Sequence, residues 1–211
     1  LNKKHSNIHS LLITMFNSHK ILSVAYVPEA TPAPSAPVLY PVAYPVVPDP
    51  SKAEPCFSAG CDLYDANDYP GALVKFKEAQ DHNPSDHRYD FNIAMCHKKS
   101  GDLRAALEHF TFAIVHYREQ QTLNPRDERI RRTLGKSYLE QGSLYYQSGI
   151  RNAATSSELS KWYFEQAKIS FSNAFEFNTP GADVNYGLAL YKLGDYRAAS
   201  AVFIGLIGKA P

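Results

Sequence analysis

One spaced pattern of small and aromatic residues occurs four times between Ala53 and Pro211. Small residues stand at positions eight and twenty of each copy and at twenty-seven of the first three, an aromatic residue stands at twenty-four and, in two copies, a proline at thirty-two. The residues are Gly60, Ala72, Phe76, Ala79 and Pro84; Ala94, Ala106, Phe110 and Ala113; Gly135, Ala167, Phe171 and Ala174; and Gly187, Ala199, Phe203, Leu206 and Pro211. These intervals place an apolar stripe on each of two helices joined by a Gly/Asp turn. The sequence therefore predicts an all-α chain of four antiparallel helix pairs.

A single helix pair cannot bury its apolar surface, so the four pairs are expected to stack as an α-solenoid. The spacing resembles the tetratricopeptide repeat family, whose signature has Gly or Ala at eight, Ala at twenty, an aromatic residue at twenty-four and Pro at thirty-two. The tryptophan that this family carries at position four is absent, and the residues there are Cys56, Asp90, Arg131 and Asp183. The resemblance implies a tetratricopeptide-type solenoid over residues 53–211.

Three segments follow from the composition along the chain. Residues 1–27 form a leader or a disordered N-terminus, residues 28–52 a Pro-rich linker, and residues 53–211 the repeat domain. The four predicted repeats are 53–86, 87–127, 128–179 and 180–211. The Pro-rich run favours an extended polyproline II conformation, either as a stiff spacer or as a ligand whose Tyr and Val side chains bind a partner or the groove of the same chain.

The sequence is compatible with more than one cellular compartment. The two apolar runs of residues 1–27 are interrupted by Asn17-Ser18-His19-Lys20, whereas a secretory signal needs an unbroken apolar stretch. The protein is expected in the cytoplasm or, if the leader is a real signal, in the periplasm or cell envelope. No run is long enough to predict a transmembrane helix.

Two repeats are longer than the pattern requires. The second reaches Asn124-Pro125 seven residues late, which predicts two extra turns on its second helix. In the third, Ala167 stands twenty residues beyond its expected place, and Thr155-Ser156-Ser157-Glu158 reads as a capping box ahead of the second helix. We expect a long, aromatic-rich hairpin that either packs on itself or docks a partner.

Charge and reactive residues give no sign of catalysis. The formal net charge is +1, so nothing indicates nucleic acid binding. Three cysteines are too few for a disulfide framework, although Cys61 and Cys96 lie at adjacent positions of stacked repeats. Gly135-Lys136-Ser137 lacks the upstream glycine of a phosphate-binding loop, and the histidines show no metal-ligand spacing. We predict that the chain is not an enzyme and carries no cofactor or metal.

In a solenoid of this kind the first helices line a concave groove, and their positions two, five, nine and twelve point toward a ligand. These residues are Glu54, Phe57, Cys61 and Tyr64; Arg88, Phe91, Met95 and Lys98; Arg129, Arg132, Lys136 and Leu139; and Gly181, Val184, Leu188 and Tyr191. Exposed large apolar residues indicate a partner, and clustered arginines bind carboxylates. We predict a groove for an extended or helical peptide that carries bulky apolar residues and at least one acid.

A second interpretation of the groove positions stays open. If the first helices are rotated by one position, Phe57, Phe91 and Met95 widen the core and the third repeat's arginines form a solvated face. Some tetratricopeptide proteins clamp the C-terminal carboxylate of chaperones with lysine, asparagine and arginine side chains. Of the clamp positions, Asn92 matches and Arg129 can replace a lysine. Phe57, Cys61 and Thr133 occupy the others, which argues against such a clamp.

The function expected from the resemblance is a non-catalytic scaffold or adaptor that binds a peptide in its groove and supports assembly of a larger complex. The alternative is a dedicated chaperone or pilot for a secretion or cell-envelope component. Repeat arrays usually end in a polar capping helix, whereas this sequence ends at Pro211 with an apolar flank around Phe203. Either further repeats follow, or this flank makes the chain a homo-oligomer.

Overall fold

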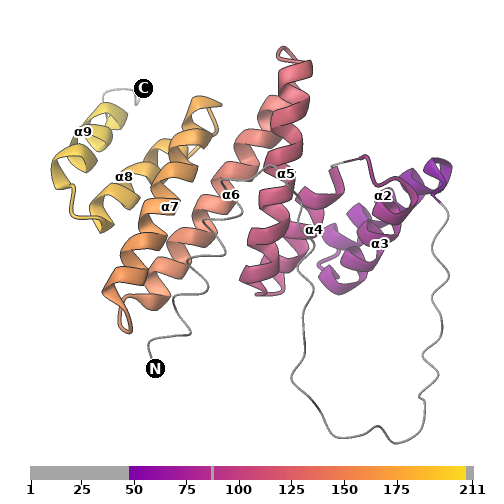
Figure 1. Cartoon of the computed structure of the whole chain (residues 1–211), viewed down its shortest axis with the longest axis horizontal. Coiled ribbons are helices and arrows are strands. Elements are labelled where there is room, and N and C mark those ends of the chain that lie inside the picture. Colours follow the sequence, from indigo (N-terminus) through magenta and orange to yellow (C-terminus); the bar gives the residue numbers. More distant parts are fainter. Residues whose placement is uncertain (1–47, 87, 208–211) are drawn as a thin grey trace, which may run out of the picture. The chain divides into compact units, whose positions relative to one another are not determined.

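A computed structural model describes residues 48–86 and 88–207 of the 211-residue chain. The described part holds eight α-helices and no strands, arranged as four pairs that follow one another in chain order (Figure 1). The pairs are α2 (Pro50–Asp65) with α3 (Tyr69–His82), α4 (Arg88–Lys99) with α5 (Leu103–Leu123), α6 (Glu128–Asn152) with α7 (Ser157–Glu176), and α8 (Ala182–Lys192) with α9 (Tyr196–Ile207). The all-α fold and the four predicted pairs are confirmed.

The predicted leader, residues 1–27, and most of the predicted linker lie outside the described residues. Among the described residues the first helix, α2, begins at Pro50, three residues before the predicted start of the first repeat. Asp49 caps this helix, since its side chain accepts a hydrogen bond from the backbone N–H of Ser51, and a proline at the first helical position needs no such partner.

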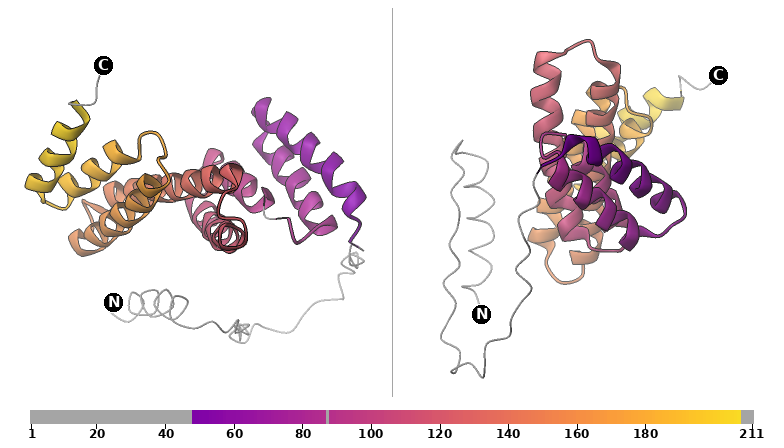
Figure 2. Two further views of the ribbon diagram at one scale, coloured as in Figure 1. Left: turned by 90° about the horizontal axis from the view of Figure 1, so that it is seen from above. Right: turned by 90° about the vertical axis from the view of Figure 1, so that its right-hand side faces the viewer.

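Consecutive pairs contact one another through the second helix of one pair and the first helix of the next: α3 packs on α4, α5 on α6 and α7 on α8. Figure 2 shows the same succession of helices from two further directions. The predicted stacking is therefore confirmed between each pair and its neighbours within the described residues.

The turns inside the first, second and fourth pairs share one local design. A residue with positive φ ends the first helix: Asn67 (φ 64°), Gly101 (φ 84°) and Gly194 (φ 84°). An aspartate follows, and its side chain accepts a hydrogen bond from a backbone N–H in the first turn of the second helix, at 3.0, 3.1 and 3.0 Å for Asp68, Asp102 and Asp195. Because Gly and Asn adopt positive φ most readily and Asp is a strong N-cap, these short motifs produce the tight turns that the sequence predicts.

Contacts between glycine and phenylalanine fix the distance between the two helices of a pair. A Cβ atom at Gly60 would lie 2.7 Å from the ring of Phe76, and one at Gly187 would lie 2.6 Å from that of Phe203. Only a residue without a side chain lets these rings reach the neighbouring backbone. The predicted role of position eight is therefore correct in the first and fourth repeats.

In the third repeat the predicted register is wrong. The ring of Phe171 lies against Gly142, where an added Cβ atom would be 2.7 Å away, while Gly135 faces Phe177 and Thr179. Phe171 follows Gly142 by 29 residues, whereas Phe76 follows Gly60 by 16, so the insertion is thirteen residues rather than twenty. The three glycines Gly135, Gly142 and Gly149 are seven residues apart and share one helix face, so the sequence pattern alone could not choose between them.

The insertion lengthens the third hairpin and adds a second contact of the same kind as that between Gly142 and Phe171. Gly149 lies against the ring of Phe164, with 2.7 Å to an added Cβ atom, which forms a second glycine–phenylalanine layer. Beside it, the ring of Trp162 contacts Tyr145 and Tyr163 edge to face, at 6.0 and 5.1 Å between centroids. These contacts favour the interpretation that the aromatic residues pack the hairpin on itself.

The ends of the long helices agree with the predicted extensions, apart from one cap. The second helix of the second repeat, α5, has 21 residues, whereas α3 has 14. Ser156, not Thr155, is the N-cap of α7, and its hydroxyl accepts a hydrogen bond from the N–H of Leu159 at 3.2 Å. The predicted capping box is therefore not formed, because Leu159 stands three residues after Ser156 where the box needs Glu or Gln, and only the serine cap remains.

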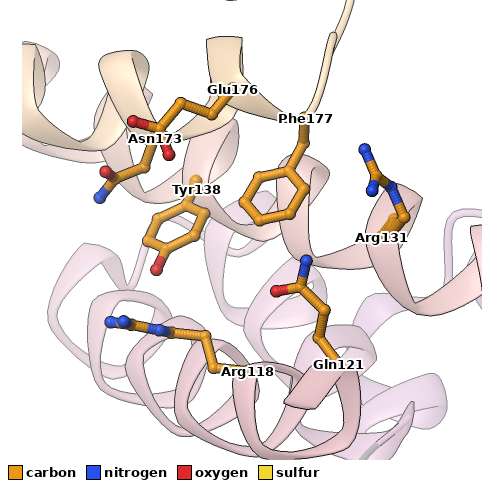
Figure 3. Close-up of a pocket in the computed structure, with 7 residues that line it drawn as sticks. All are labelled: Arg118, Gln121, Arg131, Tyr138, Asn173, Glu176 and Phe177. Carbon is orange, nitrogen blue, oxygen red and sulfur yellow. The ribbon is translucent and has the colours of Figure 1, made fainter. Parts of the chain in front are cut away.

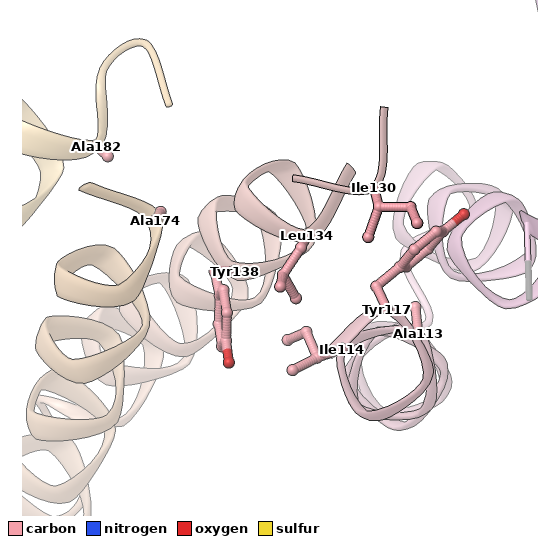
Figure 4. Close-up of a cluster of buried hydrophobic side chains, with 8 residues drawn as sticks. All are labelled: Ala113, Ile114, Tyr117, Ile130, Leu134, Tyr138, Ala174 and Ala182. Carbon is pink, nitrogen blue, oxygen red and sulfur yellow. The ribbon is translucent and has the colours of Figure 1, made fainter. Parts of the chain in front are cut away.

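The extra turns of α5 are held by a core of their own. Ile114 and Tyr117 from α5 meet Ile130, Leu134 and Tyr138 from the first turns of α6 (Figure 4). Each of these side chains is at least nine-tenths buried. The extension of the second repeat and the beginning of the third therefore form one packed unit, which is continued by Ala174 and Ala182.

Candidate functional site

The candidate site is the first-helix face, by which we mean the side of α2, α4, α6 and α8 that carries repeat positions two, five, nine and twelve. With Gly142 at position eight, these positions in the third repeat are Lys136, Leu139, Ser143 and Tyr146. The predicted residues Arg129 and Arg132 then lie on turns of α6 that precede the repeat proper. In the other three repeats the predicted positions are unchanged.

On α2 and α4 the predicted groove residues contact each other. The ring of Phe57 is half-buried between Phe76 and Tyr89, with centroid distances of 5.6 and 5.7 Å. The guanidinium carbon of Arg88 lies 4.6 Å from the centroid of the same ring, which is a cation–π contact. Arg88 also pairs with Glu54 at 2.7 Å, so Phe57 is enclosed from both sides.

Cys61 and Tyr64 complete this part of the face. Both are half-buried and pack on the core cluster around Phe76, Tyr89 and Ile93. The fully buried Cys96 belongs to the same cluster, in agreement with the predicted proximity of Cys61 and Cys96, and all three cysteines are free thiols. Burial raises the pKa of the Cys96 thiol to about 11, and burial also raises the pKa of Tyr64, to about 12. Both groups are neutral near pH 7 and serve packing rather than chemistry.

Further along α4 the predicted residues again have partners within the chain. Phe91 is half-buried and lies edge to face with Phe110, with 5.8 Å between the ring centroids. Met95 packs beside it on the cluster around Phe110. Lys98 forms an ion pair with Glu140 of α6 in which both side chains are about three-quarters buried. The α2–α4 half of the first-helix face is thus largely closed by its own contacts.

On α6 and α8 the same face is open in part: Leu139, Ser143 and Tyr146 of α6 are half-buried, whereas other side chains on this side remain exposed. Arg132 and Lys136 are exposed, and the side chain of Arg129 is 91% exposed with only Asp127 nearby, at 3.8 Å. On α8, Val184, Leu188 and Tyr191 expose 43%, 37% and 55% of their surfaces. The α6–α8 half therefore combines a row of basic side chains with an apolar stripe.

A buried polar cluster that the sequence reasoning missed lies on α3, α4 and α5. Asp90 is 5% exposed, and its Oδ1 accepts a hydrogen bond from Gln80 at 3.1 Å and lies 3.2 Å from Nδ1 of His109. Nδ1 of His116 lies 3.5 Å from Oδ2, and the ring of His97 stacks on His109 at 5.6 Å. The signal was present, because a charged residue at the core position four requires partners from neighbouring helices.

The charge state of this cluster follows from its geometry. Burial by itself raises the pKa of Asp90, but hydrogen bonds from His109 and Gln80 and the nearby imidazoles outweigh it, so the pKa lies below its usual value. Burial, together with the charge of His109, lowers the pKa of His97. Near pH 7 the cluster therefore holds a carboxylate that ties three helices together, and His109 and His116 face it.

The described residues offer no site for a metal ion or a bilayer span. No three His, Cys, Asp or Glu side chains among them are grouped so that they could hold a metal. None of the described helices is both long and apolar enough to cross a membrane.

A chaperone-tail clamp has few of its groups on this face. Asn92, the matching asparagine, donates its amide to the carbonyl of Arg88 at 2.8 Å. At the clamp positions where Lys and Asn are needed, Phe57 and Cys61 pack into the core cluster. No side chain at these two positions can donate to a terminal carboxylate.

Comparisons with known proteins agree with this architecture. A family model described as a tetratricopeptide repeat matches residues 57–110, which span α2 to the middle of α5. A search of curated proteins gave no match. Proteins of this family are generally non-catalytic interaction modules.

Three solved structures are similar to the chain. The first tetratricopeptide domain of Spaghetti, solved with the HSP90 peptide SRMEEVD, matches with a TM-score of 0.53 and 15% identity over 70% of this chain and 97% of that one. A tetratricopeptide protein of Thermus thermophilus has a TM-score of 0.46 and 25% identity, over 71% of this chain and 70% of that one. The MamA protein has a TM-score of 0.31 and 15% identity, over 72% of this chain and 88% of that one. The family match identifies a tetratricopeptide repeat at residues 57–110, and the described residues share the fold of such proteins, with four stacked helix pairs and glycine–phenylalanine contacts.

Proposed function

We propose that this protein is a non-catalytic scaffold that binds a peptide segment of a partner on the α6–α8 half of its first-helix face and thereby supports a larger complex. One observation carries the proposal: Val184, Leu188 and Tyr191 form an exposed apolar stripe on a single side of α8. Their spacing of four and three residues is that of a helix face that packs against something. Scattered exposed apolar residues are common, but an aligned row next to basic residues favours a binding surface.

The chemistry of the face defines the peptide it suits. The apolar stripe would receive bulky aliphatic or aromatic side chains, each contributing about 1.5–3 kcal/mol when fully buried. Arg132 and Lys136 would donate hydrogen bonds to an acidic residue of the peptide, since a hydrogen bond between charged groups contributes about 1.5–3 kcal/mol. α6 and α8 are both first helices and run in the same direction. The acid of the peptide should therefore lie toward the N-terminal ends of these helices and its apolar residues toward the C-terminal ends.

A chaperone tail is not the peptide we propose. The Spaghetti domain was solved with an HSP90 peptide, but at 15% identity the likeness supports the fold alone. Because Phe57 and Cys61 are held in the core cluster, the α2–α4 half lacks the donors that a carboxylate clamp needs. The open half has a different composition, with an apolar stripe in place of an asparagine-rich clamp.

The test is the affinity of a purified partner, first identified by capture on the full chain, for variants of each half. Leu188→Asp and the pair Arg132→Glu and Lys136→Glu should each lower the affinity at least about tenfold, the equivalent of about 1.4 kcal/mol. Two matched controls should bind like the wild type. Val74→Asp changes a similarly exposed residue of α3, and Lys161→Glu reverses an exposed charge on α7. Unchanged affinity for both Leu188→Asp and the charge reversal would rule out this surface.

A further inference from the structure

A pocket of about 390 Å³ opens away from the first-helix face, between α5, α6 and α7 (Figure 3). Arg118 and Gln121 line it from the extra turns of α5, and Arg131 and Tyr138 from the first turns of α6. The end of α7 closes it with Asn173, Glu176 and Phe177. Two of its three walls therefore come from segments that a regular tetratricopeptide repeat does not have. The pocket exists because α5 and α6 continue where α7 ends.

One side of the pocket is aromatic. The rings of Tyr138 and Phe177 stack at 6.1 Å between centroids with 15° between their planes, and Tyr138 is 7% exposed. Figure 3 shows the two rings side by side, with the guanidinium of Arg118 near the hydroxyl of Tyr138. Since the rings are fixed by packing on Ile114 and Leu134, this wall is present before any ligand arrives.

The polar groups of the pocket are mostly donors. Arg118 makes no ion pair with an acid of the described residues, and Arg131 has only a contact of 3.8 Å with Glu128 on its own helix. Gln121 and Asn173 add amide groups, and Glu176 is the sole acid of the lining. The lining thus carries two guanidinium groups and one carboxylate, a net positive charge that favours a singly charged anion over a phosphate.

We propose that this pocket binds an acidic side chain of a protein partner, at a second site distinct from the first-helix face. The carboxylate would accept hydrogen bonds from Arg118, whose guanidinium lies beside the hydroxyl of Tyr138 (Figure 3), and the methylene groups of the Asp or Glu would pack on the ring of Tyr138. Arg131, on the far side of Phe177, would contribute only its positive charge. Glu176 would accept a backbone N–H of the bound segment and would repel ligands of higher negative charge. The site lies on a side of α6 different from the one that carries Lys136 and Leu139, so it stands whether or not the first-helix face binds a peptide.

The test is an NMR titration of the full chain with an alanine pentapeptide, acetylated and amidated at its ends, that carries one central glutamate. The Nε–H resonance of Arg118 should shift and saturate, and that of Arg131 should change less. The same peptide with glutamine should bind at least about tenfold more weakly, because the charge-assisted hydrogen bonds are lost.

Variants assign the binding to this pocket. Arg118→Gln should weaken binding of the glutamate peptide at least about tenfold, Glu176→Gln should strengthen it, and Arg104→Gln, an exposed residue at the opposite end of α5, should leave it unchanged. Arg118 and Glu176 are both exposed, so neither change should unfold the protein, and circular dichroism checks this. Equal shifts with the glutamine peptide, no effect of Arg118→Gln, or equally strong binding of inorganic phosphate would each overturn the proposal.

Discussion

The two halves of the first-helix face use the same repeat positions for opposite purposes. On α2 and α4, positions two and five hold Arg88 and Phe57, which contact each other, and Phe91, whose ring packs on the buried Phe110. On α8, positions five, nine and twelve hold Val184, Leu188 and Tyr191, which remain exposed. The difference teaches that a repeat register identifies which residues share a face, while the neighbouring helix decides whether they are available to a partner.

The largest expected effect concerns the contact between Gly142 of α6 and Phe171 of α7. Gly142→Val should destabilise the protein by about 3 kcal/mol, because the added atoms would overlap the ring of Phe171. The midpoint of urea unfolding, followed by circular dichroism, measures this.

Its controls separate the corrected register from the predicted one. Gly205→Ala on α9, where nothing lies within 4 Å, should leave the midpoint unchanged or slightly higher. In a Phe171→Leu background the cost of Gly142→Val should fall, since the two residues are in contact. An equal cost in both backgrounds would mean that Phe171 does not pack on Gly142.

The second prediction compares an aromatic residue from each half directly. Phe57→Ala should cost about 2 kcal/mol of folding free energy, because its ring packs on two others and under Arg88. Tyr191→Ala should cost less, about 1 kcal/mol, since more than half of Tyr191 faces solvent and its ring has one edge-to-face contact, with Tyr196 at 5.2 Å. Denaturant unfolding of both variants is the measurement. Equal costs would remove the distinction between a closed and an open half.

The third prediction uses the buried carboxylate that the α2–α5 region contains. Asp90→Asn should cost about 1.5 kcal/mol at pH 7, because an amide cannot accept from both histidines and the glutamine.

The pH dependence of this effect has a defined sign. The pKa of folded Asp90 lies below its unfolded value near 3.9, so its contribution is present above that pH and is lost as the pH falls through the folded pKa. Thermal unfolding between about pH 7 and pH 3 should therefore show a smaller loss of stability for Asp90→Asn than for the wild type. Parallel pH profiles would show that Asp90 is not held as a carboxylate.

The smallest effect is expected at the ion pair over Phe57. Glu54→Gln should change the stability by less than about 0.5 kcal/mol, because the Glu54–Arg88 pair is exposed and Arg88 keeps Asp86 at 2.6 Å. The same unfolding experiment measures it, at low and at high salt. A loss above about 1 kcal/mol would indicate that the pair, rather than the ring packing, closes the α2–α4 half.

The fold could be predicted from the sequence because each local signal agrees with the next. The Gly or Asn followed by Asp at three turns and the glycine–phenylalanine spacing all point to paired helices of fixed length. The prediction lost accuracy where the chain repeats itself, since three glycines spaced by seven residues fit the third repeat equally well. Only the position of the Phe171 ring in three dimensions distinguishes them.

The candidate site was harder to predict than the fold. Spacing along the chain identified the first-helix face, but the burial of Phe57 and Met95 depends on helices that are distant in sequence. The contacts of Asp90 with His109 and His116 could not be predicted from spacing along one helix, because they join residues of α4 and α5. The α5–α7 pocket arises from two extensions and one helix end, so none of its walls has a motif of its own.

The most direct measurement of the binding surface is an NMR footprint of the partner segment on the isotopically labelled full chain. A scaffold that uses the open half should show its largest shift changes at Arg132, Lys136 and along Val184–Tyr191, with little change at Phe57 or Phe91. Shift changes concentrated on α2 and α4, with α8 unaffected, would contradict it.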